Sequence, residues 1–204
     1  MGWYSDQVVP RLLAVLMRGG DFKRLRARTL AGLRGEVLEI GFGSGLNIPF
    51  YPAAVTRVTA VEPSAVGRRL GADRIAASTV PVEFAGADAQ DLPAADQSVD
   101  SVLSTWTLCS IPDAGRALAE VRRVLRPGGA LHFIEHGLSP DAKVARMQRR
   151  LNPLQHALAG GCHLNRPIDR LVTGAGLELT RLETYYVPGP RAFAWTFEGV
   201  ATRR

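Results

Sequence analysis

The chain has 204 residues, of which 46% are apolar and 22% are charged. This length and balance predict one globular domain with a full hydrophobic core, and they exclude a disordered chain, a collagen or a coiled coil as the main architecture. The two cysteines are too few for a disulfide framework or a four-ligand zinc site, which favours a reducing, cytoplasmic setting. Because no stretch of about 18 apolar residues occurs, the sequence predicts no helix that spans a membrane.

The net charge of +6 is concentrated at the beginning of the chain. Residues 1–35 contain seven basic and two acidic residues, whereas the rest of the chain contains 18 basic and 17 acidic residues. Such a basic segment either binds an anionic lipid surface, binds a nucleic acid, or is a solvated helix face. Composition leaves these three alternatives open.

Residues 1–35 are predicted to form two helices separated by Gly19 and Gly20. Ser5 or Asp6 is the expected N-cap of the first helix, and Asp21 is the expected N-cap of the second. Apolar side chains at helical spacing define one face of the first helix: Val8, Val9, Leu12, Leu13, Val15 and Leu16. The segment is therefore expected either to pack on the domain as a lid or to contact a membrane peripherally as a basic amphipathic helix.

From residue 36 onward, strand and helix patterns alternate along the chain. Strands are predicted at 36–40, 57–61, 80–85, 98–104 and 130–135, and helices at 64–77, 115–125, 143–158 and 168–175. Two further strands, at 177–185 and 193–199, follow without an obvious helix between them. This order predicts an α/β fold with a doubly wound, mostly parallel seven-stranded sheet and an antiparallel edge hairpin.

The first predicted strand runs directly into a glycine-rich turn. Gly41, Gly43 and Gly45 allow the chain to turn tightly and a ligand to approach the backbone closely. Glu39 lies two residues before the first glycine, where a cation fits better than a pyrophosphate because two anions repel each other. The GxGxG spacing also lacks the third glycine of the dinucleotide fingerprint, since Leu46 follows it.

Acidic residues also follow the next two predicted strands. Glu62 ends the second strand and can accept hydrogen bonds from both hydroxyls of a ribose. Asp88 follows the third strand, where it can accept a hydrogen bond from an adenine amino group. Because ligands of open α/β sheets bind beyond the carboxyl ends of the strands, these acids predict a site for S-adenosylmethionine. The alternatives are a nicotinamide-dependent enzyme and a glycine turn needed only for packing.

Longer segments carry a family resemblance. In order and spacing, VLEIGFGSG, GADAQDLP, SVDSVLSTWTL and EVRRVLRPGG resemble the class I S-adenosylmethionine-dependent methyltransferases over about residues 36–136. From about residue 34 to the end, the chain is similar to the animal alkyl-thiol S-methyltransferases and their bacterial relatives, through GFGSGLNIPFYP, TLCSIP, IEHG and GGCHLNRP. The resemblance implies a Rossmann-like methyltransferase domain at residues 36–204, preceded by the N-terminal helical segment at 1–35.

The resemblance also implies the residues that bind S-adenosylmethionine and its product S-adenosylhomocysteine. From the methionine part through the ribose and adenine to the sulfonium, they are Glu39, Gly41, Gly43, Gly45, Glu62, Pro63, Asp88, Ala89, Thr105 and Trp106. The sequence contains no metal-ligand spacing. No metal is expected to be needed, because methyl transfer requires mainly positioning of the reactants and a site from which water is excluded.

The methyl acceptor is expected to meet the cofactor above the fourth and fifth strands. The expected pocket residues are Trp106, Thr107, His136, His163, Asn165 and Arg166. His136 is the candidate catalytic base. Alternatively, His136 has a structural role and forms hydrogen bonds with backbone groups. Trp106 either forms an apolar wall of the substrate pocket or packs in the core. The loop that contains His163 either forms part of the pocket or a lid over it, or is a turn held by side-chain hydrogen bonds. Cys109 is expected to be a packed, small apolar residue.

These observations predict an enzyme that methylates a small lipophilic acceptor, with a thiol as the leading candidate. The alternatives are a quinone ring or a phospholipid amine at a membrane surface, and a non-catalytic protein that binds the cofactor. No nucleic-acid partner is expected, because STWT replaces an NPPY-type motif and the basic charge lies in one terminal segment. The sequence does not indicate an oligomeric state.

Overall fold

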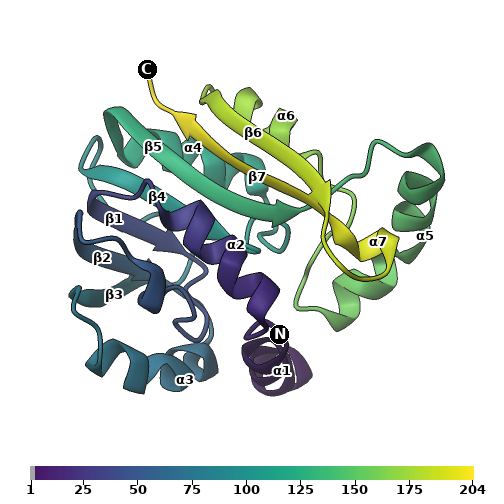
Figure 1. The fold of residues 1–204 in the computed structure, drawn as a ribbon, viewed down its shortest axis with the longest axis horizontal. Coiled ribbons are helices and arrows are strands. Elements are labelled where there is room, and N and C mark those ends of the chain that lie inside the picture. Colours follow the sequence, from purple (N-terminus) through teal and green to yellow (C-terminus); the bar gives the residue numbers. More distant parts are fainter. Residues whose placement is uncertain (1–2) are drawn as a thin grey trace.

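A seven-stranded sheet with the strand order β3-β2-β1-β4-β5-β7-β6 forms the centre of the molecule (Figure 1). This computed structural model describes residues 3–204. The strands are β1 Gly35–Ile40, β2 Val55–Val61, β3 Val82–Gly86, β4 Val99–Thr105, β5 Leu125–His136, β6 Glu178–Tyr186 and β7 Trp195–Thr202. Strands β1 to β5 pair in parallel, whereas β7 is antiparallel to both β5 and β6. The predicted doubly wound sheet with an antiparallel edge hairpin is confirmed.

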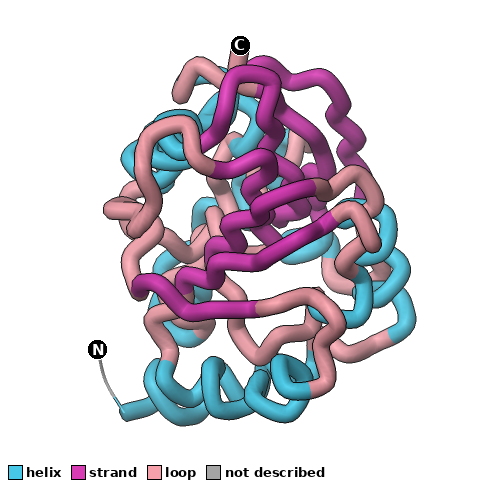
Figure 2. The backbone as a smooth tube through the Cα atoms, turned by 90° about the vertical axis from the view of Figure 1, so that its left-hand side faces the viewer, coloured by secondary structure: helices cyan, strands magenta, loops and turns pink. Residues whose placement is uncertain are grey.

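Helices cover both faces of this sheet, as the turned view makes clear (Figure 2). They are η1 Tyr4–Val8 (one π-helical turn), α1 Val9–Leu16, α2 Gly20–Leu30, η2 Ile48–Phe50 (one 3-10 turn), α3 Ala65–Ala76, α4 Ala114–Val124, α5 Ala142–Leu158, α6 Ile168–Gly174 and α7 Arg191–Ala194. Ser64 caps α3 through a 3.0 Å hydrogen bond from the Gly67 N–H, and Asp113 caps α4 through a 2.9 Å bond from the Arg116 N–H. None of these helices combines the length and apolar character that a membrane crossing requires.

Two hydrophobic cores follow from the alternation of side chains along the strands. Val37 and Leu103 pack on one side of the sheet with Leu30 of α2. Their strand neighbours Leu38 and Val102 pack on the other side, in the larger core against α4 and α6. The central strands are therefore buried on both faces, as a parallel sheet between helices requires.

The N-terminal helices differ from the prediction. Neither Ser5 nor Asp6 caps a helix, because η1 begins directly after Trp3 without a side-chain cap, and Gly19 rather than Asp21 is the N-cap of α2. The predicted apolar face of the first helix is also largely outside the core. Within α1, Val9 and Ala14 are buried, while the remaining members of that face are 42–64% exposed: Leu12, Leu13, Val15 and Leu16. A single short helix that touches the domain along one edge cannot bury so wide an apolar face.

Arginines fasten α2 across the sheet. The Arg28 Nε donates to the buried Glu198 carboxylate of β7 at 2.9 Å, and its Nη2 donates to the Tyr185 hydroxyl at 2.7 Å. Arg26, on the same helix, is itself buried. Part of the N-terminal positive charge is therefore used in contacts within the molecule.

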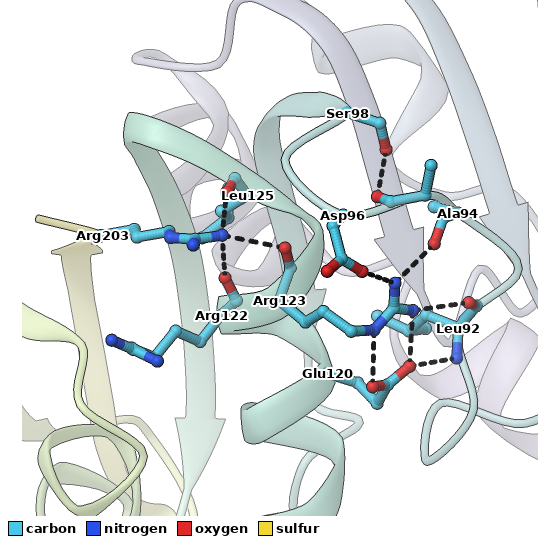
Figure 3. A network of polar contacts seen from close by, with 10 residues as sticks. Leu92, Ala94, Asp96, Ser98, Glu120, Arg122, Arg123, Leu125 and Arg203 are labelled. Atoms are coloured by element: carbon cyan, nitrogen blue, oxygen red, sulfur yellow. Dashed lines mark hydrogen bonds and ion pairs between the residues drawn. The ribbon is translucent and has the colours of Figure 1, made fainter.

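The loop between β3 and β4 is fastened to α4 by one ion-pair network (Figure 3). The Arg123 guanidinium donates to Glu120 and Asp96, each at 2.7 Å, and to the carbonyl oxygens of Leu92 at 3.0 Å and Ala94 at 2.8 Å. Glu120 in turn accepts the Leu92 N–H at 2.9 Å. This network fixes the loop that carries Asp88 relative to the strand ends.

Candidate active site

The carboxyl ends of β1, β2 and β3 bring the predicted acids to one edge of the sheet. Glu39 lies in β1 opposite Ala60, Glu62 directly follows β2, and Asp88 lies two residues beyond β3. The Glu62 N–H donates to the carbonyl of Gly86 at 3.1 Å, so the ends of the second and third strands stay paired up to Glu62, beyond a register shift between Ala60 and Val61. Glu39, the 41–45 turn, Glu62 and Asp88 are called the cofactor end below.

The glycine turn adopts a backbone that side chains oppose. Gly41 has φ +73° and Gly43 has φ +58°, both in the left-handed region that favours glycine. A Cβ at Gly41 would also overlap the side chain of Thr107, which follows β4. The Gly43 N–H donates to Glu62 Oε2 at 2.6 Å, so the turn and the acid of the second strand are linked directly.

Glu62 is buried and hydrogen-bonded at both oxygens. Besides Gly43, the Ser64 N–H donates to its Oε1 at 2.7 Å. Burial raises the pKa of Glu62, although both backbone N–H groups favour its charged form. Each carboxylate oxygen keeps a lone pair with which it can accept a ligand hydroxyl.

Glu39 is the most deeply buried acid of the cofactor end, with no exposed surface. Asn47 Nδ2 donates to its Oε1 at 2.9 Å, and the Tyr51 hydroxyl donates to its Oε2. Burial raises the pKa of Glu39 to about 7, against the opposing effects of these two bonds and of the nearby positive charge of Arg26. A cationic ligand group beside Glu39 would stabilise its charged form.

Arg26 is a site residue that the sequence analysis missed. It is only 4% exposed, its Nη1 donates to the Met17 carbonyl at 2.9 Å, and its Nε has no hydrogen-bond partner among residues 3–204. Burial lowers its pKa to about 10. Its spacing to Phe22 and Leu30, four residues away on either side, places it on the inward face of α2 and could have revealed it. A buried guanidinium with a free donor is suited to a carboxylate.

Trp106 and Thr105 lie where β4 ends. Trp106 has φ +51°, an unusual backbone for a bulky residue, and its half-buried ring packs edge-on against Phe22 with ring centroids 5.3 Å apart. The Arg26 guanidinium lies 4.8 Å from the centre of the same ring. The Thr105 hydroxyl accepts a 3.0 Å bond from Asn47, which also binds Glu39. Asn47 therefore connects the ends of β1 and β4.

The remaining predicted residues of the cofactor end lie at its rim. Asp88 is exposed and accepts hydrogen bonds from the Gln90 side chain and N–H, which hold the pKa of Asp88 below its usual value. Ala89 is partly buried against the larger core, and Pro63 is exposed. These positions are accessible to a ligand that extends outward from Glu62.

A buried carboxylate shapes the turn after β4. Glu135 of β5 accepts the N–H groups of Thr107 at 2.9 Å, Leu108 at 3.0 Å and Cys109 at 3.3 Å. It also accepts the Ser104 hydroxyl at 2.7 Å, and burial raises its pKa. Three consecutive backbone donors are thus aimed at one side chain, which fixes the direction of the 106–110 turn.

Two cysteines and a histidine meet beside this turn. Cys162 Sγ lies 2.9 Å from His136 Nε2 and 3.7 Å from Cys109 Sγ. The contact with the Cys109 thiol and burial raise the pKa of Cys162, so its thiol is protonated in this arrangement. Cys109 is buried, as expected, but it packs against sulfur and not among apolar groups alone. The 106–110 turn, His136 and the 159–167 loop are called the acceptor end below.

Other predicted pocket residues brace this end. The His163 ring lies against α5, with Nδ1 3.3 Å from the Asn152 amide nitrogen and its centroid 4.7 Å from that of His156. Arg166 donates to the carbonyls of Leu108 and Pro112 and so clamps the turn after β4. Asn165, half-buried in the same loop, makes no side-chain hydrogen bond to these groups within residues 3–204. His163 therefore faces away from His136, and the loop is held by side-chain hydrogen bonds.

Trp3 and Tyr4 neither close over the cofactor end nor enter the core. Trp3 is 75% exposed, and the Tyr4 hydroxyl donates to the Leu158 carbonyl at the end of α5 at 3.2 Å. Tyr4 thus lies beside the end of α5, next to the 159–167 loop.

The chain is similar in sequence and in fold to known methyltransferases. Residues 38–133 match the methyltransferase domain family. The chain is 35% identical over 182 residues to thiol S-methyltransferase TMT1B of Rattus norvegicus, covering 82% of this chain and 69% of that protein. It is 28% identical over 169 residues to a phosphatidylethanolamine N-methyltransferase of Cereibacter sphaeroides, covering 80% and 81%. The fold is similar to geranyl diphosphate methyltransferase in complex with SAM, with a TM-score of 0.70 at 17% identity over 95% of this chain and 89% of that one.

Proposed function

The chain belongs to the class I S-adenosylmethionine-dependent methyltransferases, and we propose that it methylates the sulfur of a small lipophilic thiol. The observation that carries the acceptor class is the 35% identity to the rat thiol S-methyltransferase over 82% of this chain. The relatives in this group act as enzymes, and S-adenosylmethionine is the cofactor.

The charged groups of the cofactor end support the binding of S-adenosylmethionine. Glu62 has free lone pairs for the ribose hydroxyls, and Asp88 lies further out for the adenine amino group. Glu39 would face the cationic part, and the free Nε of Arg26 would meet the methionine carboxylate. The turn leaves room for close approach of the ligand at Gly43, where a Cβ would meet only the Gly41 carbonyl oxygen, at 4.0 Å. When bound, the cofactor supplies a methyl group activated by a sulfonium leaving group.

This chain's residues would then position the two reactants and exclude water. Trp106 offers an apolar wall whose orientation is held by Phe22, and Glu135 fixes the turn that leads from it. In-line transfer depends on such positioning and needs no strong base when the acceptor ionises readily. A thiol with a pKa near 8.5 meets that condition. His136 as the base that takes the thiol proton stays a prediction, and its Nε2 lies against Cys162.

A phospholipid amine is the second candidate acceptor. It is favoured by the similarity to the Cereibacter sphaeroides enzyme and by the exposed apolar side chains of α1 beside the acceptor end. A quinone ring is a third acceptor to be compared in the same assay.

Methyl transfer from labelled S-adenosylmethionine tests these acceptors directly. We expect alkyl thiols to be methylated by the purified full chain, with the Glu62→Ala variant serving as the cofactor-binding control. If phosphatidylethanolamine or a quinone accepts the label while no thiol does, the thiol proposal is wrong and the methyltransferase assignment stands.

A further inference from the structure

Three side chains with metal-ligating atoms converge at the acceptor end. Cys109, His136 and Cys162 come from the turn after β4, the end of β5 and the 159–167 loop. Each offers one ligand atom, and the three atoms all lie within 4.8 Å of one another. Both cysteines are buried and His136 is half-buried. These are the two cysteines of the whole chain, brought together across 53 residues.

The backbone holds these ligands in place independently of their side chains. The His163 N–H donates to the Cys109 carbonyl at 2.8 Å, which fastens the loop to the turn next to both sulfurs. Glu135 accepts the Cys109 N–H at 3.3 Å from the other side. Gly161, with φ +85°, lets the loop approach the turn, because a Cβ there would lie 3.2 Å from the Ser110 carbonyl oxygen. Preorganisation of this kind is expected at a binding site.

The donor set and spacing suit zinc. Zinc binds thiolates at about 2.3 Å in tetrahedral geometry, so two thiolates on one ion lie about 3.8 Å apart. The Cys109 and Cys162 sulfurs are already 3.7 Å apart. The 2.9 Å separation of Cys162 Sγ and His136 Nε2 would have to widen by about 0.7 Å, to the roughly 3.6 Å expected for a sulfur and a nitrogen on one tetrahedral zinc ion. Two sulfurs and one imidazole nitrogen are the protein ligands of known catalytic zinc sites, which keep the fourth position open.

We propose that Cys109, His136 and Cys162 bind one Zn²⁺ ion whose open position takes the sulfur of the methyl acceptor. The metal site rests on this geometry alone, whereas its use for a thiol rests on the proposed function. Zn²⁺ binding would release the thiol protons of Cys109 and Cys162 to solvent. The acceptor thiol would then donate a sulfur lone pair to zinc and lose its own proton to solvent, and its sulfur would take the methyl group as S-adenosylhomocysteine leaves. Zinc with two thiolates is neutral and a third thiolate makes the site anionic, which suits the nearby Arg166 guanidinium on the Leu108 carbonyl. His136 then acts as a ligand and not as the catalytic base.

Cobalt substitution tests the metal site without an activity assay. The full chain, reduced and freed of metal by a chelator, is titrated with Co²⁺. We expect one ion per chain, a near-ultraviolet thiolate-to-cobalt band, and its loss when an equimolar amount of Zn²⁺ is added. Cys162→Ser and Cys109→Ser should each weaken Zn²⁺ binding at least a hundredfold. His156→Ala, an exposed histidine of α5, is the matched control and should leave the titration unchanged. Absence of the band in the wild-type chain overturns the proposal.

Thiol labelling keeps the test decisive if the serine variants fold poorly. Because Cys109 and Cys162 are the two thiols of the chain and both are buried, their alkylation requires transient opening of the structure, and Zn²⁺ should slow this alkylation at least tenfold in the wild-type protein at a temperature where the metal-free chain is labelled. Unchanged labelling with Zn²⁺ present argues against the site. Addition of an alkyl thiol to the cobalt form should shift the charge-transfer band, and a band that does not move rejects the acceptor role while the metal site stands. If only a non-thiol acceptor is methylated, the proposed function fails while the titration stays positive.

Discussion

The contacts at the cofactor end join residues that are closer in sequence than those joined by the contacts at the acceptor end. At the cofactor end, Glu39 is bound by Asn47 and Tyr51, which are eight and 12 residues away, and Glu62 binds Gly43 over 19 residues. At the acceptor end, Cys162 meets His136 over 26 residues and Cys109 over 53. The first is one strand–turn–strand motif with its ligands in fixed spacing, whereas the second exists only after β4, β5 and the 159–167 loop have docked. Substitutions in one end should therefore leave the other intact, and the predictions below test this separation.

The largest effect is expected from Glu62→Ala. The change removes two charge-assisted hydrogen bonds to the ribose, each worth about 1.5–3 kcal/mol, and should weaken S-adenosylhomocysteine binding by about a hundredfold in calorimetry. Glu83→Ala, an exposed acid of β3, is the control and should bind normally. The Glu62→Ala variant should still bind Co²⁺ at the acceptor end with the same absorption spectrum as the wild-type chain. Unchanged affinity would refute the assignment of Glu62.

Arg26→Met should weaken S-adenosylhomocysteine binding by about tenfold to a hundredfold. One charge-assisted bond to the ligand carboxylate, worth about 1.5–3 kcal/mol, would be lost. Thermal unfolding should show only a small loss of stability, because loss of the Nη1 bond to the Met17 carbonyl is offset by removal of a buried Nε that has no partner within residues 3–204.

A ligand that lacks the carboxylate tests whether Arg26 binds the ligand directly or acts through its packing in the protein. The decarboxylated analogue of S-adenosylhomocysteine should bind the wild-type chain and Arg26→Met with similar affinity. An equal loss for both ligands would mean that Arg26 acts through the position of Trp106 and not through the carboxylate.

The pH dependence of binding tests Glu39. With a pKa of about 7 in the cofactor-free protein, Glu39 is about one-tenth ionised at pH 6 and about nine-tenths ionised at pH 8. Because cationic S-adenosylmethionine favours the charged form, its affinity should rise about tenfold over this range in calorimetry. The Glu39→Gln variant should bind weakly and lose this dependence. A wild-type affinity that is flat from pH 6 to pH 8 would contradict the raised pKa.

The same shift predicts how folding stability changes with pH. The folded state keeps the Glu39 proton up to about pH 7, whereas the unfolded chain releases it near pH 4.5. The unfolded state therefore binds fewer protons in this window, and the contribution of Glu39 to stability falls as pH rises from about 4.5 to about 7. Thermal unfolding of the Glu39→Gln variant without cofactor should lack this decrease in stability between about pH 4.5 and about pH 7.

The smallest effect is expected at α1, next to the acceptor end. Gly160 of the 159–167 loop lies beside Val9 of α1. Arg11 lies on the same helix, and Arg18 lies in the turn two residues beyond its end. Four apolar side chains of α1 are exposed: Leu12, Leu13, Val15 and Leu16. Each basic residue near an anionic surface contributes about 1 kcal/mol at low salt. The full chain should therefore co-sediment with anionic vesicles in a salt-sensitive way, and Leu12→Ser combined with Leu16→Ser should reduce this several-fold. Leu182→Ser, an exposed leucine of β6, is the control.

Neutral vesicles distinguish this contact from general adhesion. Binding to them should be weak, because the apolar face of α1 is short and needs the electrostatic contribution. Equal sedimentation with both vesicle types, or none with either, would contradict a basic amphipathic contact.

The sequence alone determined the elements that depend on near neighbours. The Ser64 cap, the glycine turn, the acids after β1 to β3 and the alternation of strands and helices were all predicted, because capping, positive φ and side-chain period are local properties. The short helix α7 was missed, and it delays the start of β7 to Trp195. Four residues carry too little periodicity to be recognised.

Tertiary structure decided what depends on docking. Arg26 becomes a buried site residue because α2 crosses the end of β4, and the apolar face of α1 stays exposed because a single edge of that helix meets the domain. His163 turns toward α5, while Cys162, one residue earlier, meets Cys109 and His136. The spacing of the two cysteines along the chain contains no metal-ligand pattern, since 52 residues separate them in sequence. The docking of the 159–167 loop on the turn after β4 closes that distance.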